Sequence, residues 1–174
     1  WVLLMDADGQ HPPEEIPRLL QHAPAYDMIV GARSRGAGWH RDLANRIYNA
    51  LASYVTGRAI ADLTSGFRLV RAAPLRAFLY MLPNTFSYPT TITMAMARSG
   101  FALVYVPFAP ARRAGKSKIR LLRDGGRFLL IIMKVATLVA PLRIFMPLAL
   151  GVWFAGALYY VYTFLTSHRF TNMG

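Results

Sequence analysis

The sequence predicts an α/β domain followed by a membrane segment, and three observations support this. Short apolar runs alternate with helix-forming stretches from residue 1 to about residue 118, which favours a sheet covered by helices. A run without a single charge extends over 144–166, and it is long enough to cross a bilayer. Acidic residues directly follow the first apolar run. Ligands of α/β proteins gather at the carboxyl ends of strands, so we expect a binding site there.

The elements of the α/β part follow from local patterns. Leu43, Ile47 and Leu51 recur at four-residue steps before Gly57, which is typical of an amphipathic helix with a glycine stop. Pro107 must end its strand or place it at a sheet edge. In chain order we expect strands at 1–5, 27–34, 67–70 and 101–108, and helices at 12–20, 41–57 and 74–82.

The C-terminal third differs in composition from the rest. Residues 128–139 are apolar except for Lys134 and are too short to span a membrane, so an amphipathic interfacial helix is expected there. Residues 144–166 are expected to form a transmembrane helix, and a buried core helix is the alternative. The predicted organisation is an α/β domain at 1–118, a juxtamembrane helix at 119–143, a transmembrane helix at 144–166 and a loop at 167–174.

Charge narrows the range of partners. The chain has 20 Lys and Arg against 8 Asp and Glu, a net charge of +12, so its partners are expected to be anionic: nucleic acid, phosphorylated ligands or lipid headgroups. No recognisable nucleic-acid-binding motif accompanies the charge. Most cations precede the apolar span, which predicts a cytoplasmic location for that part. Zero Cys excludes disulfides and thiolate chemistry. Because Trp1 opens inside an apolar run, we expect the chain to be a fragment.

The stretch "DADGQ" carries the first candidate site. Alternate residues of an extended chain share a face, so Asp6, Asp8 and Gln10 can converge at the end of the first strand. Three oxygen ligands suit Mg²⁺ or Mn²⁺, which would complete its shell with water and with the phosphates of a substrate. A solvated acidic turn is the alternative.

Four motifs together resemble a known family. In order and spacing, "DADGQHPPEEI", "GARSR", "DLTSGFRLVR" and "RRAGKSK" are similar to the family 2 glycosyltransferases of the dolichol-phosphate mannose synthase and bacterial polyprenyl-phosphate type. The resemblance implies a GT-A type domain that transfers a sugar, with inversion, from a nucleotide diphosphate sugar to a polyprenyl phosphate at the cytoplasmic membrane face. It also implies that a metal held by Asp6, Asp8 and Gln10 bridges the donor's diphosphate. The family's first strands, which hold the nucleotide, would precede Trp1.

The same resemblance assigns roles to cationic residues. Arg33 in "GARSR" matches an arginine that binds the acceptor phosphate, and Arg41 and Arg46 lie on the helix that follows. The guanidinium fork suits phosphate oxygens, although surface helices also carry arginines without a ligand. A basic loop that closes over the donor's diphosphate would comprise Arg112, Lys116, Ser117 and Lys118.

The expected chemistry needs few further groups. Asp6 and Asp8 would act through the metal, which stabilises the departing diphosphate. Asp62, grouped with them as catalytic, could either orient a sugar hydroxyl or hold an arginine. An acceptor phosphate is already ionised and needs no strong base, so no role is assigned to His11, His22 or His40. Thr90 and Thr91 stand where many relatives carry an acidic residue, which leaves the sugar undefined.

Other classes of protein fit the sequence less well. A nucleic-acid binder would not need the apolar span. A haloacid-dehalogenase-type phosphatase would continue its Asp-x-Asp into Thr rather than Gly9. A processive polysaccharide synthase would carry a Gln-x-x-Arg-Trp stretch, which this sequence lacks. A structural membrane anchor would not need Asp6, Asp8 and Arg33. A homo-oligomer is compatible with the sequence, which leaves the oligomeric state open.

Overall fold

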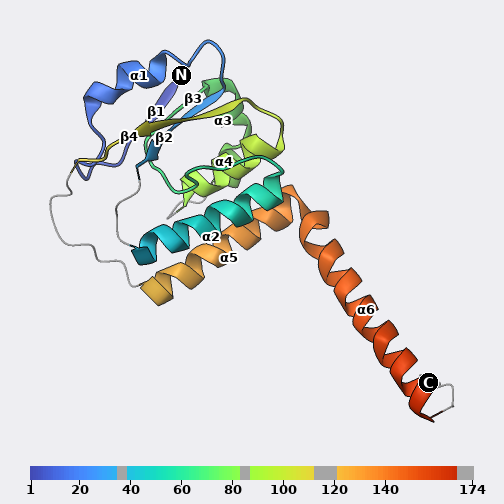
Figure 1. Cartoon of the computed structure of the whole chain (residues 1–174). Coiled ribbons are helices and arrows are strands. Elements are labelled where there is room, and N and C mark those ends of the chain that lie inside the picture. The colour runs from blue at the N-terminus through green and yellow to red at the C-terminus, as the bar shows by residue number, and fades with distance from the viewer. Residues whose placement is uncertain (35–38, 83–86, 112–120, 168–174) are drawn as a thin grey trace.

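The chain folds around a small mixed sheet. The computed structural model (Figure 1) describes residues 1–34, 39–82, 87–111 and 121–167. The strand order is β1-β3-β2-β4, with β3 antiparallel to both neighbours and β2 parallel to β4. The predicted α/β class is confirmed. The strands are β1 (Val2–Leu4), β2 (Met28–Arg33), β3 (Arg68–Val70) and β4 (Leu103–Phe108).

Most helices fall close to the stretches predicted from sequence, but α4 (Tyr88–Arg98) was not among them. The expected helix at 74–82 is divided into α3 (Ala72–Ala77) and a 3₁₀ turn, η2 (Leu79–Met81), because the backbone of Phe78 is not helical. Pro107 lies in β4, which is an edge strand, as its missing N–H requires. The remaining elements are η1 (Pro13–Glu15), α1 (Ile16–Leu20), α2 (Trp39–Thr56), α3 (Ala72–Ala77), η2 (Leu79–Met81), α4 (Tyr88–Arg98), α5 (Leu121–Val139) and α6 (Pro141–Ser167).

Alternation along β2 separates the two faces of the sheet. Ile29 packs with Leu19 of α1 on one face, whereas Met28 and Val30 pack with Ile92 of α4 on the other. All of these side chains are buried. The sheet is therefore covered on both faces by helices, which explains why β2 is apolar at successive positions.

A third layer of helices lies beyond α4. Figure 1 shows α2 and α5 side by side on the α4 side of the sheet. Met94 of α4 belongs to the same buried cluster as Val55 of α2 and Ile132 and Ala136 of α5. One face of α5 is thus part of the protein core. The helix expected to be interfacial therefore also packs in the core through this face. The boundary expected at residue 118 lies outside the described residues.

The last helix leaves the folded body. In α6, residues Pro141–Thr166 form a candidate membrane span with a mean hydropathy of 1.7, and no part of its most apolar window is buried inside the protein. Within the described part of the chain, this helix is therefore not a buried core helix. Large apolar side chains such as Val152 and Leu158 are exposed along it, as expected for a helix that contacts lipid. Residues 168–174 of the expected loop lie outside the described residues.

Candidate active site

Three segments meet at one edge of the sheet because β3 runs against its neighbours. Leu4 of β1 and Val30 of β2 both pair with Arg68, the first residue of β3. The residues after β1 and β2 and the residues before β3 therefore extend past the same edge. This topology brings the segments around Asp6, Arg33 and 62–66 to one place.

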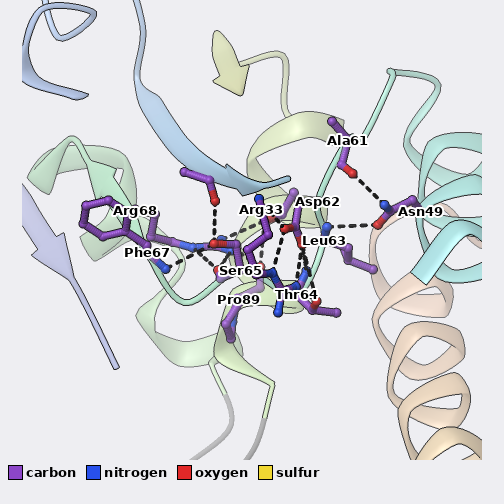
Figure 2. Close-up of polar contacts among 12 residues, drawn as sticks. Arg33, Asn49, Ala61, Asp62, Leu63, Thr64, Ser65, Phe67, Arg68 and Pro89 are labelled. Carbon is purple, nitrogen blue, oxygen red and sulfur yellow. Dashed lines mark hydrogen bonds and ion pairs between the residues drawn. The ribbon is translucent and has the colours of Figure 1, made fainter. Parts of the chain in front are cut away.

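Arg33 and Asp62 form a two-point ion pair at this edge (Figure 2). Arg33 donates from Nε to Oδ2 at 2.9 Å and from Nη2 to Oδ1 at 2.8 Å. The backbone N–H groups of Arg33 and Thr64 donate to the same carboxylate, each at 3.1 Å. Burial alone would raise the pKa of Asp62, but the hydrogen bonds and charge of Arg33 hold it below its ordinary value. Of the two alternatives expected for Asp62, holding an arginine is the one observed.

The loop that carries Asp62 is anchored on α2. The side chain of Asn49 donates to the Ala61 carbonyl at 2.6 Å and accepts the Leu63 N–H at 3.0 Å. Figure 2 shows both bonds, which involve the residues directly before and after Asp62 in the sequence. A single amide side chain thus holds the carboxylate in position beneath Arg33.

Arg68 is a buried cation near this pair. Its side chain is fully buried and donates to the Ser65 carbonyl, to the Pro89 carbonyl at 2.9 Å and to Thr93 Oγ1 at 2.8 Å. Burial lowers its pKa to about 10, although Tyr88, Tyr105 and the carboxylates of Asp62 and Asp6 oppose this change. The guanidinium therefore remains charged at neutral pH. Sequence reasoning assigned it no role, because nothing local distinguishes Arg68 from a surface arginine.

The acidic loop after β1 turns sharply. Asp8 Oδ1 accepts the N–H of Gln10 at 3.1 Å, and the Gln10 carbonyl accepts the N–H of Ala111 at 3.1 Å. Asp6 is exposed, whereas Asp8 and Gln10 are partly buried. In the described part of the chain, no group of three or more His, Cys, Asp or Glu side chains could enclose a metal ion. The acidic loop offers two carboxylates, from Asp6 and Asp8, and the side-chain amide of Gln10.

The structure describes only some of the remaining expected site residues. Arg46 lies exposed on α2 and, among the described residues, forms no ion pair with Asp62 or other acidic groups. Arg41 is in the first turn of α2, and its side chain lies outside the described residues. Thr90 and Thr91 are buried at the start of α4. The basic loop expected at Arg112, Lys116, Ser117 and Lys118 also lies outside the described residues.

Two family models match parts of this chain. Residues 1–79 match the family model described as glycosyl transferase family 2, and residues 140–174 match the model described as GtrB C-terminal hairpin. The chain belongs to the family 2 glycosyltransferases. The expected resemblance is thereby confirmed.

Several curated relatives carry related names. An undecaprenyl-phosphate 4-deoxy-4-formamido-L-arabinose transferase of Edwardsiella ictaluri is 32% identical over 125 residues, covering 70% of this chain and 37% of the relative. An undecaprenyl-phosphate mannosyltransferase of Micrococcus luteus is 32% identical over 66% of this chain and 51% of its own length. A polyprenol monophosphomannose synthase of Mycolicibacterium smegmatis is 30% identical over 66% and 47%. The chain spans about half or less of these relatives.

Proposed function

We propose that this chain is part of an enzyme that transfers a sugar from a nucleotide diphosphate sugar to a polyprenyl phosphate, with inversion and with a divalent metal. One observation carries the proposal. At one edge of the sheet, the acidic loop of Asp6 and Asp8 lies beside Arg33, which is ion-paired with Asp62. This edge belongs to a body that continues into an exposed apolar helix. The names of the relatives support a polyprenyl-phosphate acceptor.

Asp6, Asp8 and Gln10 are the proposed ligands of Mg²⁺ or Mn²⁺. Two carboxylates fit such an ion, because Mg²⁺ is commonly bound by one or two carboxylates together with substrate phosphates rather than by an all-protein cage. Once bound, the ion would stabilise the negative charge that develops on the departing diphosphate. The turn between Asp8 and Gln10 keeps the three donors on one short loop.

Arg33 is the proposed anchor of the acceptor phosphate. Asp62 engages Nε and Nη2 of the guanidinium, so Nη1 lies outside this pair. The side chain of Arg33 is 34% exposed and can meet an anion from solvent. Asp62 then orients the guanidinium rather than reacting itself. An oxygen of the ionised acceptor phosphate attacks the anomeric carbon of the donor sugar as the bond from that carbon to the diphosphate breaks, and the nucleoside diphosphate leaves. Arg41 and Arg46 are proposed as further phosphate contacts, and Arg112, Lys116, Ser117 and Lys118 as the donor loop.

The outer faces of α2 and α5 support a membrane-facing orientation. Leu43 and Ile47 of α2 are exposed one turn apart, and Leu130 and Leu138 of α5 flank the exposed Lys134 at four-residue steps. Exposed leucines with an interspersed cation are typical of helices that lie against headgroups. We propose that this surface rests on the cytoplasmic leaflet and brings the lipid phosphate to Arg33.

The proposal is tested with the full-length gene product in membrane vesicles. A panel of labelled nucleotide sugars is supplied with a polyprenyl phosphate and Mg²⁺ or Mn²⁺, and we expect one donor to label an organic-extractable lipid. Asp8→Asn should lower the rate by on the order of 100-fold, whereas the exposed control Glu14→Gln should not. Unchanged transfer by Asp8→Asn would contradict the mechanism. Labelling of a growing polymer instead of lipid would indicate a polysaccharide synthase, and no transfer from any donor would indicate a non-catalytic binding protein.

A further inference from the structure

His11 occupies a position that the proposed reaction does not use. Its side chain is buried, with 9% of the residue exposed, although it follows the acidic loop directly. The imidazole stacks on Phe67 with ring centroids 5.2 Å apart and an interplanar angle of 18°. Phe108 meets it edge-on, with centroids 6.0 Å apart. The ring is therefore packed between Phe108 of β4 and Phe67, the residue directly before β3.

One ring nitrogen is committed to the backbone of the acidic loop. The N–H of Asp6 donates to His11 Nδ1 at 3.0 Å. A nitrogen that accepts a hydrogen bond carries no proton, so the neutral ring is protonated at Nε2. This bond connects the two ends of the loop that contains Asp6, Asp8 and Gln10. The loop is thus closed by a side chain, not by a strand.

Gly66 lies close to the carboxylate of Asp6. A methyl group built at Gly66 would lie 2.6 Å from Cγ of Asp6, so the carboxylate occupies the space that any side chain would fill. Tyr88 donates to the Gly66 carbonyl at 3.2 Å and fixes this part of the backbone. The Asp6 N–H is therefore bonded to His11, and the Asp6 carboxylate lies against Gly66.

We propose that His11 is a positioning residue, whose Nδ1 holds the backbone of Asp6 so that the Asp6 carboxylate is presented to a divalent cation. The inference rests on the proposed function, because a cation at Asp6 is part of it. The inference is more specific than the proposed function. It states that the hydrogen-bond acceptor at the Nδ1 position, and not the bulk of the ring alone, sets the metal affinity. Groups that orient a metal ligand commonly change the affinity by 10- to 100-fold when removed.

Two substitutions separate the acceptor from the ring. In His11→Asn the amide oxygen can take the place of Nδ1, whereas in His11→Leu no acceptor remains. Mn²⁺ binding to the full-length gene product is measured by electron paramagnetic resonance, with Mn²⁺ alone and with uridine or guanosine diphosphate. We expect His11→Leu to weaken Mn²⁺ binding by about 10-fold or more, and His11→Asn to restore most of it. His22→Asn serves as the matched control, because His22 contacts Tyr26 away from the acidic loop, and it should bind Mn²⁺ as the wild type does.

A second measurement does not depend on the metal. In protein labelled with ¹⁵N-histidine, the signal that disappears in His11→Asn should have the pattern of the Nε2–H tautomer. An Nδ1–H tautomer would overturn the proposal. Equal loss of Mn²⁺ binding in folded His11→Asn and His11→Leu would also overturn it, as would wild-type affinity in His11→Leu or no Mn²⁺ binding by the wild type. Normal Mn²⁺ effects without sugar transfer would support the role of His11 and contradict only the proposed function.

Discussion

The Arg33–Asp62 pair joins residues that are 29 positions apart, and removing one partner tests how much it stabilises the site. Asp62→Ala deletes a carboxylate that accepts hydrogen bonds from Arg33 Nε, Arg33 Nη2 and two backbone N–H groups. The guanidinium would remain without its counter-charge. The side chain of Asp62 is 12% exposed and that of Arg33 is 34% exposed, so solvent can compensate only part of the loss.

The magnitude follows from these exposures. Breaking a fully buried pair costs about 3–5 kcal/mol, and an exposed pair contributes about 0.2–1 kcal/mol. Because water reaches a third of Arg33, we expect Asp62→Ala to lower the free energy of unfolding by about 2–3 kcal/mol. For a chain of this size, about 2–4 °C of Tm corresponds to each kcal/mol, which predicts a decrease of roughly 4–12 °C.

Scanning calorimetry of the full-length gene product in detergent measures this decrease. Arg33→Met and the double variant complete a cycle, in which we expect a coupling of about 1–3 kcal/mol. Glu15→Ala is the matched control, because its pair with Arg18 is more exposed and should change Tm by less than about 2 °C. The reasoning is refuted if Asp62→Ala changes Tm no more than Glu15→Ala does, or if the effects of the two single changes simply add.

Three further predictions concern pH and two glycines. The pKa of Asp62 is held below its ordinary 3.8, so its contribution to stability should be complete above about pH 4 and disappear as the pH falls through that lower value; the Tm difference between wild type and Asp62→Asn measures it. Gly66→Ala should displace the Asp6 carboxylate and weaken Mn²⁺ binding by about 10-fold or more, measured by titration. Gly57→Ala should cost about 1–2 kcal/mol, because Gly57 has φ +75° and its new methyl would lie 2.7 Å from Arg143 Nη2; unfolding measurements test this.

Each of these predictions has a contrary outcome. A Tm difference that grows as the pH falls below 4 would reverse the assigned direction for Asp62. Wild-type Mn²⁺ affinity in Gly66→Ala would show that the carboxylate is not confined there. Gly156→Ala in α6 is the control for Gly57→Ala, since nothing lies within 4 Å of the added methyl. Equal effects of these two changes would contradict the reasoning about the junction of α2 and α6.

Local patterns account for the elements and for the type of chemistry expected. The steps of Leu43, Ile47 and Leu51 predicted α2, and the run without charges predicted the exposed helix α6. Asp6 and Asp8 were found as candidates because they directly follow an apolar strand. These features depend on neighbours within one or two turns, which a single sequence displays.

Contacts across the sheet could not be predicted in this way. Nothing local indicates that Asp62 pairs with Arg33, because that pairing depends on β3 running antiparallel between β1 and β2. The same holds for His11, whose bond to Asp6 requires the loop to fold back between Phe67 and Phe108. The buried face of α5 likewise depends on its packing against α2 and α4.

The sequence by itself therefore determined the α/β class, the apolar span and the residue types of the site, since these follow from periodicity and composition. Only the tertiary structure decided which of those residues meet. Its strand order brings three separate segments to one edge of the sheet. There Arg33 is paired with Asp62, Arg68 is buried as a cation and Asp6 is held between His11 and Gly66. The physical reason is that charges and hydrogen bonds act over a few ångströms in space, irrespective of separation along the chain.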